Sequence, residues 1–329
     1  MKTTKFFRST LLITFTFLLV LFLQSCKDNA TEPTELTDDE FVKQVVLNGF
    51  DNSSVEDNLI AQERTDFDDG SAVPDDDSGP ILSPLDSLKR WGRIITGTNV
   101  NINIENSGDT LKIVHITRTI NGYFRIIGYK NGQVDSVNKP YTQVFNRNVE
   151  FKRIGYSPYP RLNWRLYRVS CLDGQTTQPQ IGSDYVMITK VEFYKNNSPM
   201  PTLVLNGPDF QNFYFITAYF GGIGIPSVNR GDQITIKVYT TSQNSDPDYV
   251  AFHWAKNTFG FHRKKFQLES QTGSGPYYRV YSKTFNIYSQ HRIGVFNGSI
   301  SASTKESLYD DDISKFASDQ VTFPYKVLQ

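Results

Sequence analysis

The stretch "TLKIVHITRTINGYFRIIGYKNG" (Thr110–Gly132) decides the fold of the segment around it. Two runs rich in isoleucine, threonine and aromatic residues flank Asn121-Gly122, and Asn131-Gly132 follows the second run. Asn-Gly between strand-like runs is a strong hairpin signal, because both residues tolerate the positive φ angles of a tight turn. The stretch therefore predicts two antiparallel strands joined by a turn at 121–122, with a further turn at 131–132.

The neighbouring residues also have the pattern of strands. "NVNINIEN" (Asn99–Asn106) places Val100, Ile102 and Ile104 on one face and asparagines on the other, which is the period-2 pattern of a half-buried strand. "VEFKRIGY" and "NWRLYRVSC" continue the strand-like texture, and no long segment with a helical period follows residue 85. We expect residues 85–180 to form a basic, antiparallel β domain.

A second block of short strands begins near Tyr185. Ile234, Ile236 and Val238 alternate with polar residues, and turn signals recur about every ten residues, as in sandwiches and barrels. The block resembles bacterial immunoglobulin-like modules, most clearly in "NRGDQITIKV", where a turn enters a strand. This resemblance implies an immunoglobulin-like β-sandwich domain over 181–329 and no particular activity. The predicted fold class is all-β, with two antiparallel β-sandwich-like domains.

Charge is distributed unevenly, although the formal net charge of the chain is zero. Residues 27–80 contain 16 acidic and 3 basic side chains, a net charge of −13, whereas residues 81–180 contain 14 basic and 6 acidic ones, a net charge of +8. An acidic segment with few aromatic residues cannot bury enough apolar surface to offset the entropy of ordering it. We expect 26–84 to be a mostly disordered acidic tether that contacts the basic segment at low salt.

One short helix is expected within this tether. "LTDDEFVKQVVLNG" (Leu36–Gly49) carries a capping box formed by Thr37 and Glu40, and apolar residues follow at helical spacing. Gly49 is placed to end the helix. The pattern predicts an amphipathic helix near 38–48, which is too short to be stable alone and must dock on a domain or a partner.

The N-terminus has the features of an export signal. Lys2, Lys5 and Arg8 precede the apolar run "LLITFTFLLVLFL" (Leu11–Leu23). These 13 residues are fewer than the roughly 20 that span a bilayer as a helix. A basic start, a short apolar centre and small residues after it are typical of a signal peptide that is removed.

The residues after the apolar run specify the kind of signal. "LQSC" (Leu23–Cys26) resembles a bacterial lipobox, and Lys27-Asp28 resembles the export tag that follows it in lipoproteins of Bacteroidota. The resemblance implies that residues 1–25 are cleaved, that Cys26 is acylated, and that the protein is anchored in the cell envelope, at the outer membrane. Periplasmic and surface-facing orientations are both open. The alternative is an ordinary secretory signal with a chance cysteine.

Signatures of catalysis and of metal binding are absent from the sequence. The chain has no HExxH, no CxxC, no GxSxG and no phosphate-binding loop. The acidic run "DFDDGSAVPDDDSG" (Asp66–Gly79) departs from the spacing of a calcium loop, so a solvated spacer is favoured. Cys171 is expected to be a buried apolar side chain, unpaired if Cys26 carries lipid. We expect no metal and no cofactor.

Two stretches combine rings and cations as binding surfaces do. In "HWAKNTFGFHRKKF" (His253–Phe266) the candidates are Lys256, Phe259, Phe261, Arg263, Lys264 and Lys265, and in "YSPYPRLNW" (Tyr156–Trp164) they are Tyr156, Tyr159 and Trp164. Cations interleaved with aromatics can grip an anionic polymer, and exposed rings can stack on sugars. The alternative for the first is a solvated loop whose phenylalanines fold back into the core. The alternative for the second is chance exposure of aromatic residues, which make up 14% of the chain.

Together these features predict a lipid-anchored envelope protein that is a non-enzymatic binding or scaffolding module. Its expected partners are membrane lipid through Cys26 and a glycan or an envelope protein. Nucleic acid is not expected outside the cytoplasm. A hydrolase or carbohydrate-processing enzyme with an unrecognised pair of carboxylates remains one alternative, and a surface adhesin acting through the 253–266 loop is another.

Overall fold

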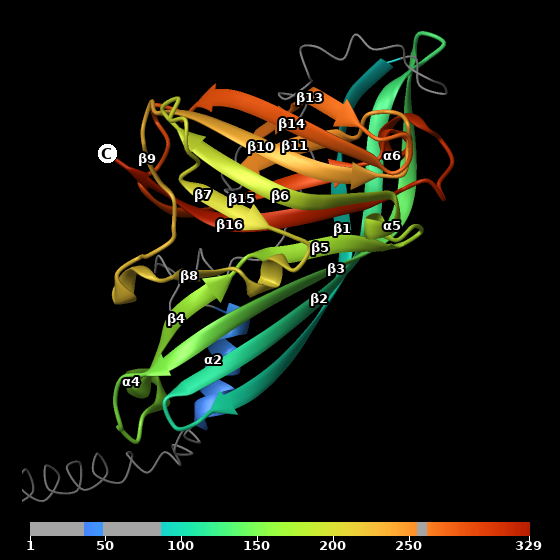
Figure 1. Ribbon diagram of the computed structural model, residues 1–329. Coiled ribbons are helices and arrows are strands. Elements are labelled where there is room, and N and C mark those ends of the chain that lie inside the picture. The colour runs from blue at the N-terminus through green and yellow to red at the C-terminus, as the bar shows by residue number, and fades with distance from the viewer. Residues whose placement is uncertain (1–35, 49–86, 255–261) are drawn as a thin grey trace, which may run out of the picture. The chain divides into compact units, whose positions relative to one another are not determined.

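The computed structural model describes residues 36–48, 87–254 and 262–329 (Figure 1). Residues Asp38–Gln329 form one compact unit. Two sheets build this unit, and every strand pair is antiparallel except β9 with β16. The all-β prediction is therefore confirmed. No helix among the described residues is long and apolar enough to cross a bilayer.

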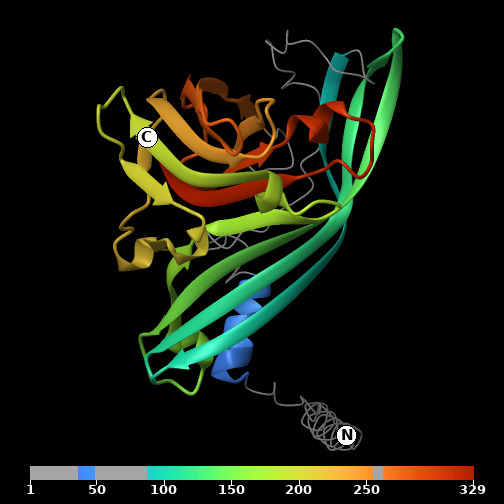
Figure 2. The same cartoon turned by 45° about the vertical axis from the view of Figure 1, so that its right-hand side comes forward.

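The first sheet has eleven strands, eight of them in the order β1-β2-β3-β5-β16-β15-β11-β12, with β4, β8 and β9 paired beside this path. The strands are β1 (Ser87–Ser107), β2 (Leu111–Lys130), β3 (Gln133–Arg153), β4 (Trp164–Ser170), β5 (Leu172–Gln178), β8 (Tyr214–Ile216), β9 (Ser227–Asn229), β11 (Tyr249–Trp254), β12 (His262–Lys265), β15 (Gly294–Ser303) and β16 (Ser318–Leu328). The first three strands are twice as long as any other in this sheet or nearly so, and Figure 2 shows them running from the α2 end to the α6 end.

The second sheet has five strands in the order β13-β14-β10-β6-β7. They are β13 (Gln267–Thr272), β14 (Tyr277–Asn286), β10 (Gln233–Ser242), β6 (Val186–Lys195) and β7 (Leu203–Asn206). The inward residues of β10, including Ile234, Ile236 and Val238, belong to one core with Val321 and Phe323 of β16. The two sheets thus make a sandwich, as the alternating pattern predicts.

The predicted turn at Asn121-Gly122 is wrong, because β2 passes through both residues without a break. Gly122 lies against β1, and a Cβ at this position would collide with the carbonyl oxygen of Ile94. The glycine therefore serves a close approach of two backbones beside the irregularity between Ile95 and Gly97. The turn predicted at 131–132 is present, with φ of 52° at Asn131 and 76° at Gly132.

The first sheet continues across the predicted boundary at residue 180. β5 pairs with β3 on one side and with the C-terminal strand β16 on the other. The segments 85–180 and 181–329 therefore share a sheet, and each supplies strands that the other needs. The two segments are parts of one compact unit.

The predicted helix is present as α2 (Asp38–Asn48), and its buried residues Val42, Val45 and Val46 join the main core. The remaining helices in the described residues are short: α4 (Pro160–Asn163), α5 (Gly182–Tyr185), α6 (Lys305–Tyr309), η1 (Phe210–Asn212) and η2 (Ala218–Phe220). The disorder expected for most of 26–84 and the acidic run 66–79 lie outside the described residues.

The docking of α2 changes the interpretation of the acidic segment. Residues 49–86 connect α2 to β1, and both elements belong to the same compact unit. Residues 49–86 therefore do not lie between the compact unit and the lipid anchor predicted at Cys26. Only Lys27–Thr37, eleven residues, lie between that cysteine and α2.

Candidate functional site

The connection between β3 and β4 projects apolar side chains into solvent. Four of them, which we call the aromatic tip, are Ile154, Tyr156, Tyr159 and Leu162, exposed by 42%, 79%, 52% and 48% respectively. Two of the sequence-predicted residues, Tyr156 and Tyr159, thus lie on the surface together.

The loop that carries the tip is internally braced. Asn163 is buried, and its side chain accepts a hydrogen bond from the backbone N–H of Ser157 at 2.6 Å and donates one to the carbonyl of Ser157 at 2.6 Å. The backbone N–H of Ile154 also donates to the carbonyl of Asn163 at 2.6 Å. These contacts close the loop on itself, so the exposed tyrosines are presented by an ordered turn.

The structure places Trp164 in the core instead of on this surface. The residue is 2% exposed, and its ring lies 4.9 Å from the Lys112 ammonium and 5.4 Å from the Arg153 guanidinium. The reason is the phase of β4, in which Trp164 and Leu166 point inward while Arg165 and Tyr167 point outward. The ring is therefore unavailable for stacking on a ligand.

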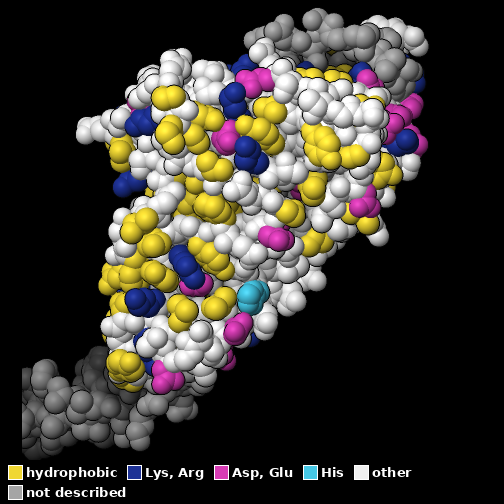
Figure 3. Space-filling model, in the orientation of Figure 1, with side chains coloured by type: hydrophobic (Ala, Val, Ile, Leu, Met, Phe, Trp, Pro, Cys, Tyr) yellow, Lys and Arg dark blue, Asp and Glu magenta, His cyan; other side chains and the backbone are white. Residues whose placement is uncertain are grey.

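The outward residues of β3, β4 and β8 with η2 form a second feature, the basic–aromatic face, which consists of Lys152, Tyr167, Arg168, Tyr214 and Phe220. The Lys152 ammonium lies 5.3 Å from the Tyr167 ring and 5.9 Å from the Phe220 ring. The Arg168 guanidinium lies 4.5 Å from the Tyr214 ring and 5.7 Å from the Tyr167 ring. Figure 3 shows basic and hydrophobic side chains side by side over β4 and β8.

Glu150 fixes the position of Arg168 on this face. Its two carboxylate oxygens accept hydrogen bonds from Arg168 Nε at 2.6 Å and Nη2 at 2.7 Å, and its side chain is only 3% exposed. The hydrogen bonds that Arg168 donates to Glu150 raise the pKa of the Arg168 guanidinium. A bidentate pair of this kind orients the guanidinium plane, which in turn holds the Tyr214 and Tyr167 rings beside it.

The second predicted site, the 253–266 loop, is described only in part. Lys256, Phe259 and Phe261 lie outside the described residues. Arg263 is buried, 4.6 Å from the Trp91 ring, and donates a hydrogen bond to the Trp91 carbonyl at 3.3 Å. This buried cation thus joins β12 to β1.

The remaining two cations of this loop lie nearer the surface. Lys264 is exposed, while the Lys265 ammonium lies 5.3 Å from the Tyr249 ring. The described part of the stretch therefore does not form a cluster of basic side chains in solvent.

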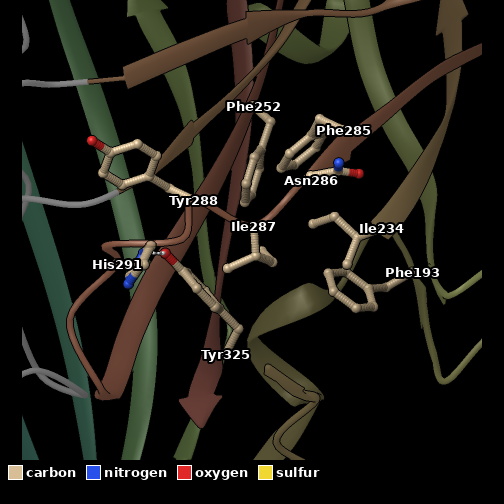
Figure 4. A pocket seen from close by; sticks show the side chains of 9 residues that line it. All are labelled: Phe193, Ile234, Phe252, Phe285, Asn286, Ile287, Tyr288, His291 and Tyr325. Carbon is tan, nitrogen blue, oxygen red and sulfur yellow. Dashed lines mark hydrogen bonds between the residues drawn. The ribbon is translucent and has the colours of Figure 1, made fainter. Parts of the chain in front are cut away.

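An apolar pocket lies at one end of the sandwich (Figure 4). Its lining consists of Phe193, Ile234, Phe252, Phe285, Asn286, Ile287, Tyr288, His291 and Tyr325. His291 Nε2 lies 3.1 Å from the Tyr325 hydroxyl, and Nδ1 lies 2.8 Å from the carbonyl of Arg292. Since both ring nitrogens have partners within the protein, this histidine has a structural role.

Two carboxyl groups have markedly raised pKa values. Burial raises the pKa of Asp319 to about 7 and that of Asp173 to about 7. Asp319 accepts hydrogen bonds from the backbone N–H groups of Ile188 at 2.6 Å and Gln320 at 3.0 Å, so it bridges β16 to β6 of the other sheet. Neither carboxyl lines the pocket of Figure 4, and the charge of Asp173 adds to the rise in the pKa of Asp319.

The described residues include no cluster of His, Cys, Asp and Glu that could hold a metal ion. Cys171 is buried and unpaired, and burial raises the pKa of its thiol. The raised pKa disfavours the thiolate, which is the nucleophilic form, as is typical of a buried structural cysteine. Cys26 lies outside the described residues.

Comparison with known proteins finds no matching family model, no matching curated protein and no matching solved structure. No related protein therefore indicates a function, and the arrangement of the surface side chains is what suggests one.

The sequence interpretation missed Tyr167, Tyr214 and Phe220. The signal for Tyr167 was present in "NWRLYRVS", where its phase is opposite to that of Trp164 and Leu166. Tyr214 and Phe220 gave no such signal, because their place beside β4 depends on the pairing of β8 with β4 across more than 40 residues.

Proposed function

We propose that this chain is a lipid-anchored, non-enzymatic binding protein of the bacterial cell envelope, and that the basic–aromatic face binds an anionic glycan. The lipobox-like "LQSC" (Leu23–Cys26) supports the anchor. The alternation of cations and rings on one face supports the ligand class.

The observation that carries the ligand class is the geometry around Tyr167. Its ring lies 5.3 Å from the Lys152 ammonium and 5.7 Å from the Arg168 guanidinium, and it meets the Phe220 ring edge-on at 5.1 Å. Rings stack on the apolar faces of sugars, while a neighbouring ammonium attracts carboxylate or sulfate groups. Lys152 is exposed and the other four residues of the face are half-buried, so a polymer could bind along the face without being enclosed.

Replacing Cys26 by Ser should remove the protein from the membrane fraction, since the serine cannot be acylated. Fractionation of cells that express the two forms, with detection by antibody, measures the change. A variant with Cys171 replaced by Ala is the control, because the buried thiol cannot carry lipid. Membrane association of the Cys26→Ser form at the level of the parent would disprove the anchor.

Replacing Lys152 by Gln and Tyr167 by Ser together should weaken binding to an acidic polysaccharide by tenfold or more, about 1.4 kcal/mol. Affinity electrophoresis through a gel containing alginate or heparin measures this retardation. The matched control is Lys190→Gln/Tyr239→Ser, since the Lys190 ammonium lies 3.8 Å from the Tyr239 ring on the other sheet. Equal retardation of the two double variants would assign the binding to general charge and not to this face.

A further inference from the structure

We infer that the aromatic tip is the membrane-contacting end of the folded unit and that Ile154, Tyr156, Tyr159 and Leu162 lie in the lipid interface. This inference rests on the proposed acylation of Cys26. It adds the orientation of the unit and a second contact with lipid.

Helix α2 begins beside the aromatic tip. Asp38, its first residue, forms an ion pair with Arg153 at 3.4 Å, and the Arg153 guanidinium stacks on the Tyr156 ring at 4.7 Å. Asp39 forms an ion pair with Lys112 at 2.6 Å, and that ammonium lies over Trp164, directly after the tip loop. The point at which the chain enters the unit is thus at the tip.

The chain between the proposed acylation site and the start of α2 is short. Eleven residues, Lys27–Thr37, separate Cys26 from Asp38. Fully extended, such a segment covers about 40 Å, and any other conformation covers less. An acylated Cys26 therefore restricts the distance between the membrane and the α2 start, and the tip is beside this start.

The long strands extend away from the aromatic tip. β3 runs from Gln133 to Arg153, and Val134 is about 60 Å along the strand from Arg153 at roughly 3.3 Å per residue. The 131–132 turn is thus much farther from α2's first residue than the tip is. Of these two ends, only the tip is within easy reach of the bilayer surface.

The side chains of the aromatic tip suit the lipid interface. Two tyrosines beside an exposed isoleucine and leucine combine the side chains that settle at the boundary of headgroups and acyl chains. Arg161, also exposed, lies among them and can reach anionic headgroups. Exposed aliphatic side chains contribute little to sugar binding, so the tip differs in ligand from the basic–aromatic face.

A site-specific label tests this orientation on the full acylated chain. Tyr156→Cys carries an NBD fluorophore in one sample and Val134→Cys carries it in the other, since Val134 is 60% exposed at the opposite end of β3. Cys171 is buried and Cys26 is acylated, so the introduced thiol is the one that reacts. Both proteins are reconstituted into phosphatidylethanolamine–phosphatidylglycerol vesicles with or without doxyl-labelled lipid.

The expected result is at least a twofold loss of emission at position 156 in doxyl vesicles, with none at position 134. Equal emission at both positions in vesicles that carry the protein on flotation would overturn this inference and leave the anchor intact. Failure of the acylated chain to float with the vesicles would overturn both proposals. Shielding of the label at 156 without lipid would mean that the tip contacts a second copy of the chain, which also overturns the inference.

Discussion

Replacing Arg279 by Met is expected to lower the free energy of unfolding by about 3–5 kcal/mol, the cost of leaving a buried charge without its partner. Arg279 Nη1 and Asp248 Oδ2 are 2.9 Å apart, and both side chains are fully shielded from solvent. Arg279 Nη2 also donates to the carbonyls of Asn244 at 2.6 Å and Ser245 at 2.9 Å. The substitution removes the cation and leaves these acceptors unsatisfied.

The position of this ion pair explains the size of the effect. Residues 243–248 lead from β10 in the second sheet to β11 in the first, so Arg279 of β14 fixes the chain where it crosses between sheets. Asp248 accepts a further hydrogen bond from the Ser242 hydroxyl at 2.8 Å. Burial raises the pKa of Asp248, and the Arg279 charge opposes that rise.

Urea denaturation followed by circular dichroism measures the change as a lower midpoint at an unchanged slope. The control is Lys237→Met, which breaks a partly exposed ion pair with Glu269 at 3.0 Å and should cost no more than about 1 kcal/mol. If Arg279→Met costs no more than Lys237→Met, the crossing does not depend on the buried pair. Arg279→Met/Asp248→Leu should recover part of the loss, because it removes the uncompensated carboxylate.

Replacing Gly174 by Ala is expected to destabilise the protein by about 1–3 kcal/mol through overpacking. Gly174 of β5 lies directly opposite Phe145 of β3, and an added Cβ would collide with the Cδ1 and Cε1 atoms of the Phe145 ring. Phe145 is 1% exposed, so its ring has little room to move. The glycine therefore accommodates the ring where β5 joins β3 to β16.

The test is a double-mutant cycle. Phe145→Ala alone should cost about 3–5 kcal/mol, because it leaves a cavity in the core. Combined with Gly174→Ala, the cost should be less than the sum by about 1–3 kcal/mol, since the collision no longer exists. Gly97→Ala is the control, because no atom lies within 4 Å of the added Cβ. Additive costs in the cycle would show that Gly174 does not serve the ring.

The sequence could predict those parts of the fold that depend on neighbours along the chain. Helix α2 was predictable because its capping residues and apolar stripe lie within "LTDDEFVKQVVLNG". The inward residues of β10 were predictable from alternation alone, as was the turn at 131–132. Each of these is a local consequence of backbone geometry.

The remaining features depend on contacts between distant residues. Asn121-Gly122 has the composition of a turn, yet Gly122 is needed where β1 crosses close to β2. The pairing of β5 with β16 joins residues more than 140 positions apart, and the short strand "LDGQTTQ" (Leu172–Gln178) does not identify its partner. The same holds for the candidate binding residues. Tyr156 and Tyr159 could be predicted from the neighbouring sequence, whereas Tyr214 and Phe220 could not, because they depend on the pairing of β8 with β4.

The position of β16 has a consequence for the order of assembly. Ser318–Leu328 pairs with β5, β9 and β15. These three strands come from different parts of the chain, and their pairing is incomplete until β16 has been synthesised. During synthesis β1, β2 and β3 can pair as successive hairpins. The backbone groups on the edge of β5 that faces β16 stay unpaired until β16 is available. Closing that edge is a long-range step and therefore a slow one. Until then the unpaired edge of β5 can form hydrogen bonds with a strand other than β16. A chain that ends before residue 318 would keep this edge exposed.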